Sequence, residues 1–117
     1  MGRWRCIIRI YIAGPYSGNG SLLDREVNTS RAVRAGIELV RRGHKPFIPH
    51  LTHYVEEDYQ AQFAYETYLE WDIEWLQFCE GLLRLPGVSE GADREEAIAM
   101  SLDIPVYYSI DEVPSGV

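Results

Sequence analysis

The sequence predicts an α/β protein built on an open, mainly parallel sheet of four to five strands, with helices on both faces. Short apolar segments rich in β-forming residues alternate with amphipathic helical segments, and this β-α-β-α-β-α-β order is typical of parallel sheets. Glycine-rich turns follow the first and third expected strands, at residues 14–20 and 86–91. The chain has 117 residues, an ordinary length for one domain, and we expect a single domain over 1–117.

The first half of the chain supplies two of the expected strands and a long helix. Residues 6–13 are mostly apolar and β-rich, which predicts a buried strand. Ser21, with Asp24 three residues later, matches a capping box, and we expect the helix to run to about Arg42. A short second strand follows at 45–48. The apolar stripe of the helix has the spacing of one helical face and consists of Ala32, Ala35, Gly36, Leu39 and Val40.

The second half completes the alternating pattern. Residues 49–64 are expected to form a longer irregular segment rich in acids and aromatics. A second helix is expected over 65–78 and a third strand over 81–85. A third helix over 92–102 and a last strand over 104–108 end the pattern. With a flavodoxin-like strand order, the first and third strands are neighbours. The two glycine loops then face one crevice beyond the carboxyl ends of the strands, where open sheets bind ligands.

The composition excludes several classes of partner. The formal net charge is −7, and no basic stripe is available for a nucleic-acid backbone. A small anion is still possible, because a helix N-terminus supplies local positive potential. No apolar run approaches the roughly 18 residues of a membrane span, and no signal peptide is evident, so we expect no membrane partner. Cys6 and Cys79 lack metal-like spacing and are expected to be reduced thiols of a cytoplasmic protein.

Glu95 is the most unusual residue of the third helix. It shares one helical face with Ala92, Ala99 and Leu102, and that face should pack on the sheet. A carboxylate there must be desolvated, paired or functional. The dipole of the helix favours its ionised form, as a nucleophile requires. A solvated position at the rim, or an ion pair with an arginine, is the alternative.

Four further residues are candidates for chemistry. Ser89 and Gly91 at the start of the third helix suit a phosphate, although a Ser N-cap beside a turn glycine is the simpler interpretation. Asp72 lies in a helix with several other acids, where a solvated face is the simplest interpretation. Tyr11 ends the first strand and is most simply a core aromatic.

Metal and cofactor sites are not expected. His50 and His53 form an i, i+3 pair in an expected loop, and His44 lies on the other side of the short second strand. No third ligand is near in the sequence, which is not a zinc-site pattern. The first glycine loop is neither a Walker loop nor a complete dinucleotide fingerprint, so neither ATP nor NAD is expected.

The ordered motifs resemble the nucleoside 2-deoxyribosyltransferase-like superfamily. The motifs are Tyr11–Pro15, Asp72–Leu76 and Ser89–Glu95. The nearest groups are the nucleoside 5′-monophosphate N-glycosidases and small uncharacterised bacterial and phage homologues. The latter share Pro49–Leu51 and Leu83–Gly87. The resemblance implies a flavodoxin-like, Rossmann-like fold, no cofactor, and a homodimer or higher homo-oligomer.

The resemblance also implies roles for individual residues. Glu95 matches the catalytic glutamate that attacks the sugar C1′. Asp72 matches the aspartate that assists departure of the base or orients the nucleophile, and Tyr11 matches the tyrosine that holds the glutamate. Ser89 matches the serine that binds the 5′-phosphate, and Gly91 lies in the same turn.

The other expected substrate contacts come from the first glycine loop and the segment after the second strand. They are Gly14, Ser17, Gly18 and His50. The loop lacks the arginine that deoxynucleotide hydrolases place there, and Arg94 is a candidate replacement. Residues expected around the base are His50, His53, Tyr54, Tyr65 and Tyr68.

The resemblance therefore implies an N-glycosidase that hydrolyses the base–sugar bond of a nucleoside 5′-monophosphate. Ser89 favours hydrolysis, because a phosphate site selects nucleotides over nucleosides. A 2-deoxyribosyltransferase that exchanges bases on nucleosides is one alternative. A non-catalytic nucleotide-binding module is another. The base, and the choice between ribose and 2-deoxyribose, stay open.

Overall fold

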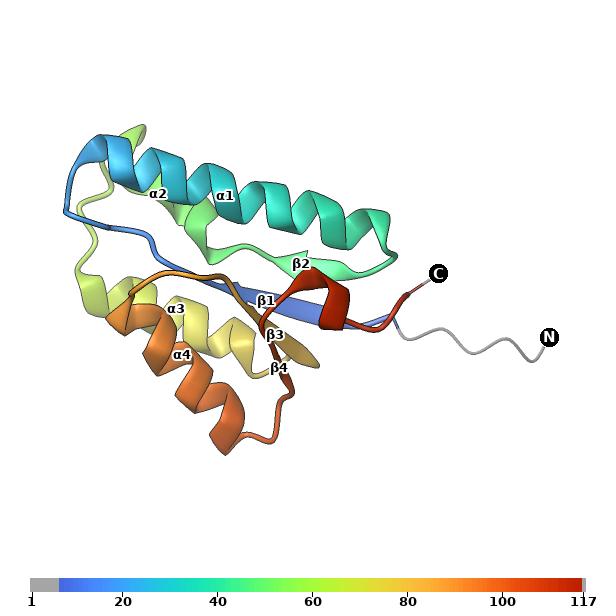
Figure 1. The fold of residues 1–117 in the computed structure, drawn as a ribbon. Helices are drawn as coiled ribbons and strands as arrows, with labels where there is room; N and C mark the ends of the chain where they lie inside the picture. Colours follow the sequence, from blue (N-terminus) through green and yellow to red (C-terminus); the bar gives the residue numbers. More distant parts are fainter. Residues whose placement is uncertain (1–6, 117) are drawn as a thin grey trace.

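A computed structural model describes residues 7–116, whose strands form one parallel sheet (Figure 1). The strands are β1 (Arg9–Ala13), β2 (Lys45–Phe47), β3 (Gly81–Arg84) and β4 (Val106–Tyr107). Within residues 7–116 the sheet has four strands in the order β2-β1-β3-β4, and every neighbouring pair is parallel. This order confirms the predicted flavodoxin-like α/β fold and the predicted pairing of the first and third strands.

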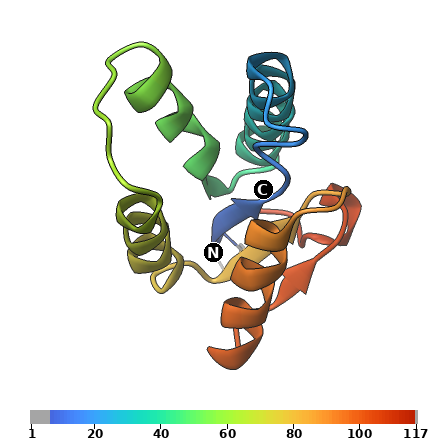
Figure 2. The same ribbon diagram turned by 90° about the vertical axis from the view of Figure 1, so that its left-hand side faces the viewer.

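Helices cover both faces of the sheet, as predicted (Figure 2). Helix α1 (Leu22–Arg41) lies on one face, and α3 (Tyr65–Leu76) and α4 (Glu90–Ser101) lie on the other. Successive β1 side chains point to opposite faces because a strand has a period of two. Ile10 therefore joins the core under α1. Tyr11 joins the core shared with α3 and α4, which brings its ring to the helix that carries Glu95.

Helix α1 begins and packs as its sequence pattern predicts. The Ser21 hydroxyl caps it by accepting the backbone N–H of Asp24 at 3.0 Å. Gly36 allows close packing, because a Cβ there would lie 2.5 Å from the Ile48 side chain. Val40 is 57% exposed, so its place in the apolar stripe was wrong. The last buried residue of the helix is Leu39.

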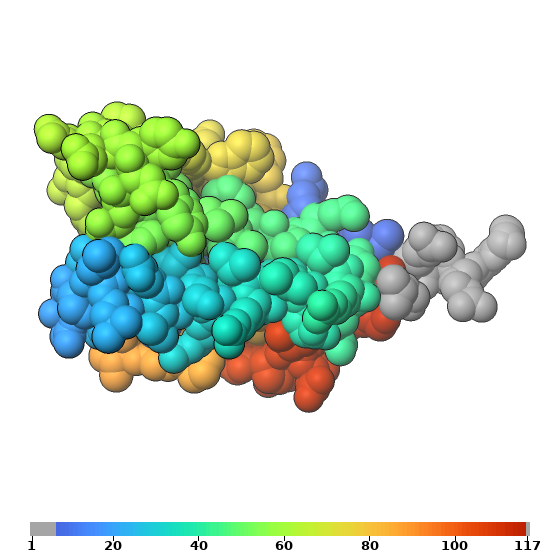
Figure 3. Space-filling model, turned by 90° about the horizontal axis from the view of Figure 1, so that it is seen from above, coloured from blue at the N-terminus to red at the C-terminus, as the bar shows by residue number. Residues whose placement is uncertain are grey.

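The segment expected to be irregular folds into two short helices, η1 (Pro49–Thr52) and α2 (His53–Glu57). Pro49 occupies the first position of η1, where a missing N–H costs nothing, and the Thr52 hydroxyl donates to its carbonyl. Seen from above, this segment lies beside α1 and covers the same side of the molecule (Figure 3). Helices this short are hard to predict because they show less than two turns of periodicity.

Glu56 stabilises the loop that joins α2 to α3. Its carboxylate accepts the backbone N–H groups of Gln62 and Phe63, each at 3.0 Å, and the Tyr68 hydroxyl. Gln60 and Gln62 have φ of 50° and 58°, a region that non-glycine residues rarely adopt. The loop is therefore held in a strained backbone conformation by one carboxylate.

The remaining predicted boundaries shift by a few residues. Cys6 lies outside the described residues, so its state is not seen. Helix α3 ends at Leu76 rather than 78, and α4 begins at Glu90 rather than 92 because Ser89 caps it. Leu102 lies just past α4 and is exposed, so its place on the buried face was wrong. Among the described residues, no helix is long and apolar enough to cross a membrane.

The C-terminal segment docks on the amino end of the sheet through His44. This side chain is fully buried. Its Nδ1 accepts the backbone N–H of Ile8 at 3.3 Å, and its Nε2 lies within hydrogen-bond distance of the Pro114 carbonyl. After η2 (Ile110–Glu112), Val113 enters the core under α1. His44 thus ties the start of β1 to the end of the chain.

Candidate active site

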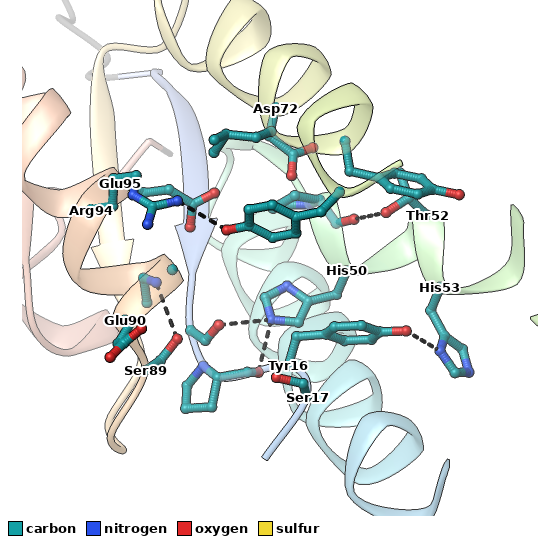
Figure 4. A pocket seen from close by; sticks show the side chains of 18 of the residues that line it. Tyr16, Ser17, His50, Thr52, His53, Asp72, Ser89, Glu90, Arg94 and Glu95 are labelled. Atoms are coloured by element: carbon teal, nitrogen blue, oxygen red, sulfur yellow. Dashed lines mark hydrogen bonds between the residues drawn. The ribbon is translucent and has the colours of Figure 1, made fainter. Parts of the chain in front are cut away.

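A cavity of about 630 Å³ lies at the carboxyl ends of β1 and β3 (Figure 4). Four segments line it: the first glycine loop over 14–18, the η1–α2 segment over 49–56, α3 over 65–72, and the start of α4 over 88–95. The two glycine loops therefore face one crevice, as the strand order predicted. All of the predicted cavity residues except Tyr11 and Tyr54 lie in this lining.

Glu95 faces the sheet and is held by Tyr11. The Tyr11 hydroxyl donates a hydrogen bond to Glu95 Oε2. Burial raises the Tyr11 pKa, and the charge of Glu95 raises it further, so this phenol stays a donor. Burial also raises the pKa of Glu95 to about 7, against the opposing effects of the Tyr11 bond and of Arg84 and Arg94. Burial therefore outweighs these three opposing effects, and near neutral pH Glu95 is divided between its ionised and neutral forms.

Asp72 projects into the same cavity from α3, on the opposite wall (Figure 4). It is half-buried, whereas Glu70 and Glu74 of the same helix are exposed, so the interpretation of Asp72 as part of a solvated face was wrong. Asp72 Oδ1 is buried and has no hydrogen-bond partner among the described residues. Burial raises the Asp72 pKa to about 7, and the charge of Glu95 contributes to the rise. The cavity thus contains two coupled carboxyl groups that titrate near neutral pH.

The first turn of α4 forms the next part of the wall. Ser89 is its N-cap, and Oγ accepts the backbone N–H of Ala92 at 3.1 Å, which is the simpler of the two predicted roles. No described residue accepts the Ser89 hydroxyl proton, so the O–H can donate to a ligand. A Cβ on Gly91 would meet only Ser89 Oγ, at 4.0 Å. Glycine costs about 1 kcal/mol relative to alanine in a helix. Packing does not require a glycine at this position. The glycine leaves the backbone at residue 91 uncovered where it faces the cavity.

Arg84, which was not among the predicted site residues, holds the turn that leads into α4. Its side chain is only 10% exposed and pairs with Asp93 at 3.0 Å. The guanidinium also donates to the carbonyl of Leu85, and at 2.9 Å to that of Gly87. Gly87 has φ of +119°, which favours glycine. One buried cation therefore fixes the end of β3, the turn and the first turn of α4 relative to one another.

His50 fixes the first glycine loop. Its Nε2 lies 3.2 Å from the Gly14 carbonyl and 3.1 Å from the Pro15 carbonyl, so this nitrogen carries the proton and donates. Burial lowers the His50 pKa, which keeps the ring neutral. Gly14 permits close approach of the two loops, because a Cβ there would lie 3.0 Å from Leu85 Cβ. His50 is therefore a neutral anchor rather than a cation for phosphate.

Ser17 and Gly18 lie at the outer end of the same loop. Gly18 has φ of +54°, and a Cβ there would lie 2.3 Å from Asp24 Oδ2. The Asp24 carboxylate accepts the backbone N–H of Asn19 at 2.9 Å. Turn geometry thus explains Gly18 without a ligand, whereas Ser17 lines the cavity and is exposed.

An aromatic wall completes the cavity opposite α4. The Tyr16 hydroxyl lies 2.7 Å from His53 Nδ1, and burial raises the Tyr16 pKa. Tyr65 and Tyr68 line the cavity from α3, as predicted, whereas Tyr54 is exposed and lies outside the lining. Tyr16 was not among the predicted site residues, although its place in the glycine loop that follows β1 was a usable signal. Among residues 7–116, no group of three or more His, Cys, Asp or Glu side chains is placed to hold a metal ion.

The fold and the site define a class of protein. It is an α/β protein with a cavity at the switch point of a parallel sheet, the place where such sheets bind ligands. The chain belongs to the family described as a domain of unknown function (DUF7768), which matches residues 8–109. That match spans the sheet and every cavity-lining residue. No curated protein matches the chain.

Proposed function

We propose that the protein is an N-glycosidase that hydrolyses the base–sugar bond of a nucleoside 5′-monophosphate. One observation carries the proposal: Asp72 and Glu95 face one cavity, and both have a pKa raised to about 7. Cleavage of a glycosidic bond passes through an oxocarbenium-like transition state, which needs a carboxylate beside C1′ and an acid for the leaving group. Two coupled carboxyl groups with pKa values near 7 can supply both at neutral pH.

The proposed first step separates the base from the sugar. Ionised Glu95 bonds to C1′ through its free oxygen, while Tyr11 holds the other oxygen by the observed hydrogen bond. The electrons of the C1′–N bond go to the base, which takes the proton of neutral Asp72. The products of this step are the free base and a sugar phosphate esterified to Glu95.

The second step releases the sugar phosphate. Asp72, now a carboxylate, takes a proton from water, and the water oxygen bonds to C1′. The C1′–O bond to Glu95 breaks and its electrons return to the Glu95 carboxylate. Both carboxyl groups are then in their starting states, so one water is consumed for each base released.

The start of α4 supports a phosphorylated substrate. The Ser89 hydroxyl, the bare backbone at Gly91 and the positive end of the α4 dipole lie on the wall that also carries Glu95. A phosphate held there would place the sugar between this turn and the two carboxyl groups. This supports a nucleotide over a nucleoside as the substrate.

A panel of ribo- and deoxyribonucleoside 5′-monophosphates tests the proposal, with the released base measured by chromatography. We expect base release from at least one member, and its loss in Glu95→Ala. Glu74→Ala is the matched control, because Glu74 is exposed on α3 and lies outside the cavity lining. Failure of every nucleotide to release base would refute the proposal. If bases are exchanged on nucleosides only when a second base is added, the protein is a transferase and the hydrolase proposal is wrong.

A further inference from the structure

Helix α3 carries Asp72, but few contacts fix its position on the sheet. Leu76 is the one fully buried residue of its 12, all of which lie within the described part of the chain. Tyr68, Asp72 and Leu76 follow one another at intervals of four residues, so they lie along one face of the helix. Leu76 holds this face at its carboxyl end. The position of Asp72 therefore also depends on what holds Tyr68.

Glu56 of α2 holds Tyr68. The Tyr68 hydroxyl donates to Glu56 Oε2. The same carboxylate accepts the backbone N–H groups of Gln62 and Phe63, each at 3.0 Å. The hydrogen bond from Tyr68, followed by that from Phe63, lowers the pKa of Glu56, so the carboxyl group is an anion at neutral pH. Hydrogen bonds to an ionised acceptor are stronger than those between neutral groups, and Glu56 therefore fixes both the loop and the first turn of α3.

The loop over 58–64 joins two helices on different sides of the sheet. Helix α2 lies beside α1, and α3 lies on the other face (Figure 2). Phe63 of the loop packs on Tyr68 with ring centroids 5.9 Å apart, and Tyr68 stacks on Trp71. Gln60 and Gln62 have positive φ, a conformation that persists only where surrounding contacts impose it. The Glu56 carboxylate makes such contacts, so the loop connects α2 rigidly to α3.

We propose that Glu56 is a positioning residue for the reaction: by holding the Tyr68 hydroxyl and the 58–64 loop, it keeps Asp72 in the cavity opposite Glu95. This inference deepens the proposed function, on which it rests for the role of Asp72 as the acid. Glu56 also lines the cavity. However, its carboxylate has about four acceptor positions and already accepts three hydrogen bonds from the chain, which favours a structural contact over substrate binding.

A displacement of α3 would change the electrostatic environment of Asp72. Burial raises the Asp72 pKa to about 7, and the charge of Glu95 contributes to the rise. If α3 moves outward, Asp72 becomes more solvated and lies farther from Glu95, so its pKa falls toward the ordinary 3.8. The charged and titratable groups that surround Asp72 from other elements include Arg94 and Glu95 on α4, His50 and Glu56 on the η1–α2 segment, Tyr16 on the first glycine loop, and Tyr11 on β1.

Tyr68→Phe tests the proposal, because it keeps the ring, removes the donor to Glu56 and changes none of these surrounding groups. Isotopically labelled aspartate carboxyl carbons are titrated by NMR in the full chain, and Asp72→Asn identifies the Asp72 signal. We expect the Asp72 pKa to fall from about 7 toward 3.8 in Tyr68→Phe. Tyr59→Phe is the matched control, since Tyr59 is 83% exposed in the same loop and should leave the Asp72 pKa unchanged. An unchanged Asp72 pKa in Tyr68→Phe would overturn the proposal.

The kinetics of base release separate positioning from substrate binding. Tyr68→Phe should lower kcat roughly 10-fold and change KM less, because a displaced acid no longer reaches the leaving base. Asp72 must be protonated to act, so its lower pKa should move the alkaline limb of the pH–rate profile to lower pH. If Glu56 binds substrate instead, Glu56→Gln would raise KM while Tyr68→Phe would leave the alkaline limb in place, and the proposal would be wrong.

The NMR titration distinguishes this failure from failure of the proposed function, because it does not require turnover. A lower Asp72 pKa in Tyr68→Phe, without base release from any nucleotide by the unmodified protein, rejects the glycosidase and keeps the placement of Asp72 by Glu56. Base release with the same kcat and the same pH–rate profile in Tyr68→Phe rejects the inference and keeps the glycosidase.

Discussion

Glu95→Gln is expected to stabilise the fold at alkaline pH while it abolishes base release. A carboxyl group whose pKa is higher in the folded than in the unfolded chain favours the fold at low pH. Its contribution is lost as the pH rises through the folded pKa. Burial raises the Glu95 pKa from its ordinary 4.5 to about 7. At about 1.4 kcal/mol per pH unit, this corresponds to roughly 3 kcal/mol. Glutamine keeps an oxygen for the Tyr11 hydroxyl and does not titrate.

Urea unfolding followed by circular dichroism at about pH 4 and about pH 8 measures the effect. At pH 8 the free energy of unfolding of Glu95→Gln should exceed that of the unmodified protein by roughly 3 kcal/mol. At pH 4 the two should be nearly equal. The Asp72 pKa is also raised, so the stability of the variant keeps a residual pH dependence. Glu74→Gln is the exposed control and should follow the unmodified protein. Parallel pH dependence of the Glu95→Gln variant and the unmodified protein would refute the reasoning.

Three further variants test the supporting contacts. Tyr11→Phe removes the hydroxyl that lowers the Glu95 pKa, so the acidic limb of the pH–rate profile should move to higher pH. The rate of base release should also fall roughly 10- to 100-fold. An unshifted limb would contradict this role. Arg84→Met leaves two turn carbonyls without their donor, so it should lower the free energy of unfolding in urea by about 2–4 kcal/mol. The same variant should raise the KM for nucleotide. His44→Ala releases the Pro114 carbonyl and should cost about 2–3 kcal/mol; faster amide exchange at Ile8 checks it, and unchanged exchange would argue against the contact.

The sheet and its main helices were predictable because their signals are local. The β1 segment alternates between two cores with the period of a strand, so the direction of Tyr11 follows from the position of Ile10. The predicted apolar stripe on α1 was wrong only at Val40, because periodicity does not show how wide a face of the helix is covered by the core. The η1 and α2 helices were missed since each is too short to establish a period.

The cavity was predictable in outline but not in its electrostatics. Strand order alone brings the two glycine loops together, and Ser89 and Gly91 lie where the helix start was expected. The environment of Asp72 depends on how α3 packs on the face of the sheet that it shares with α4, which no local pattern specifies. The same holds for Arg84, whose partners belong to the turn and to α4 and become neighbours only after folding.

Helix α3 has little anchorage for an element that carries a proposed catalytic group. Of its 12 residues, all within the described part of the chain, Leu76 alone is fully buried, and Trp71 and Trp75 are exposed. Segments with few buried contacts open locally at a lower free energy than the core. Warming should therefore move Asp72 away from Glu95 while the strands remain paired. The heat tolerance of the site would then be set by one lightly held helix, and inactivation would precede the melting of the sheet.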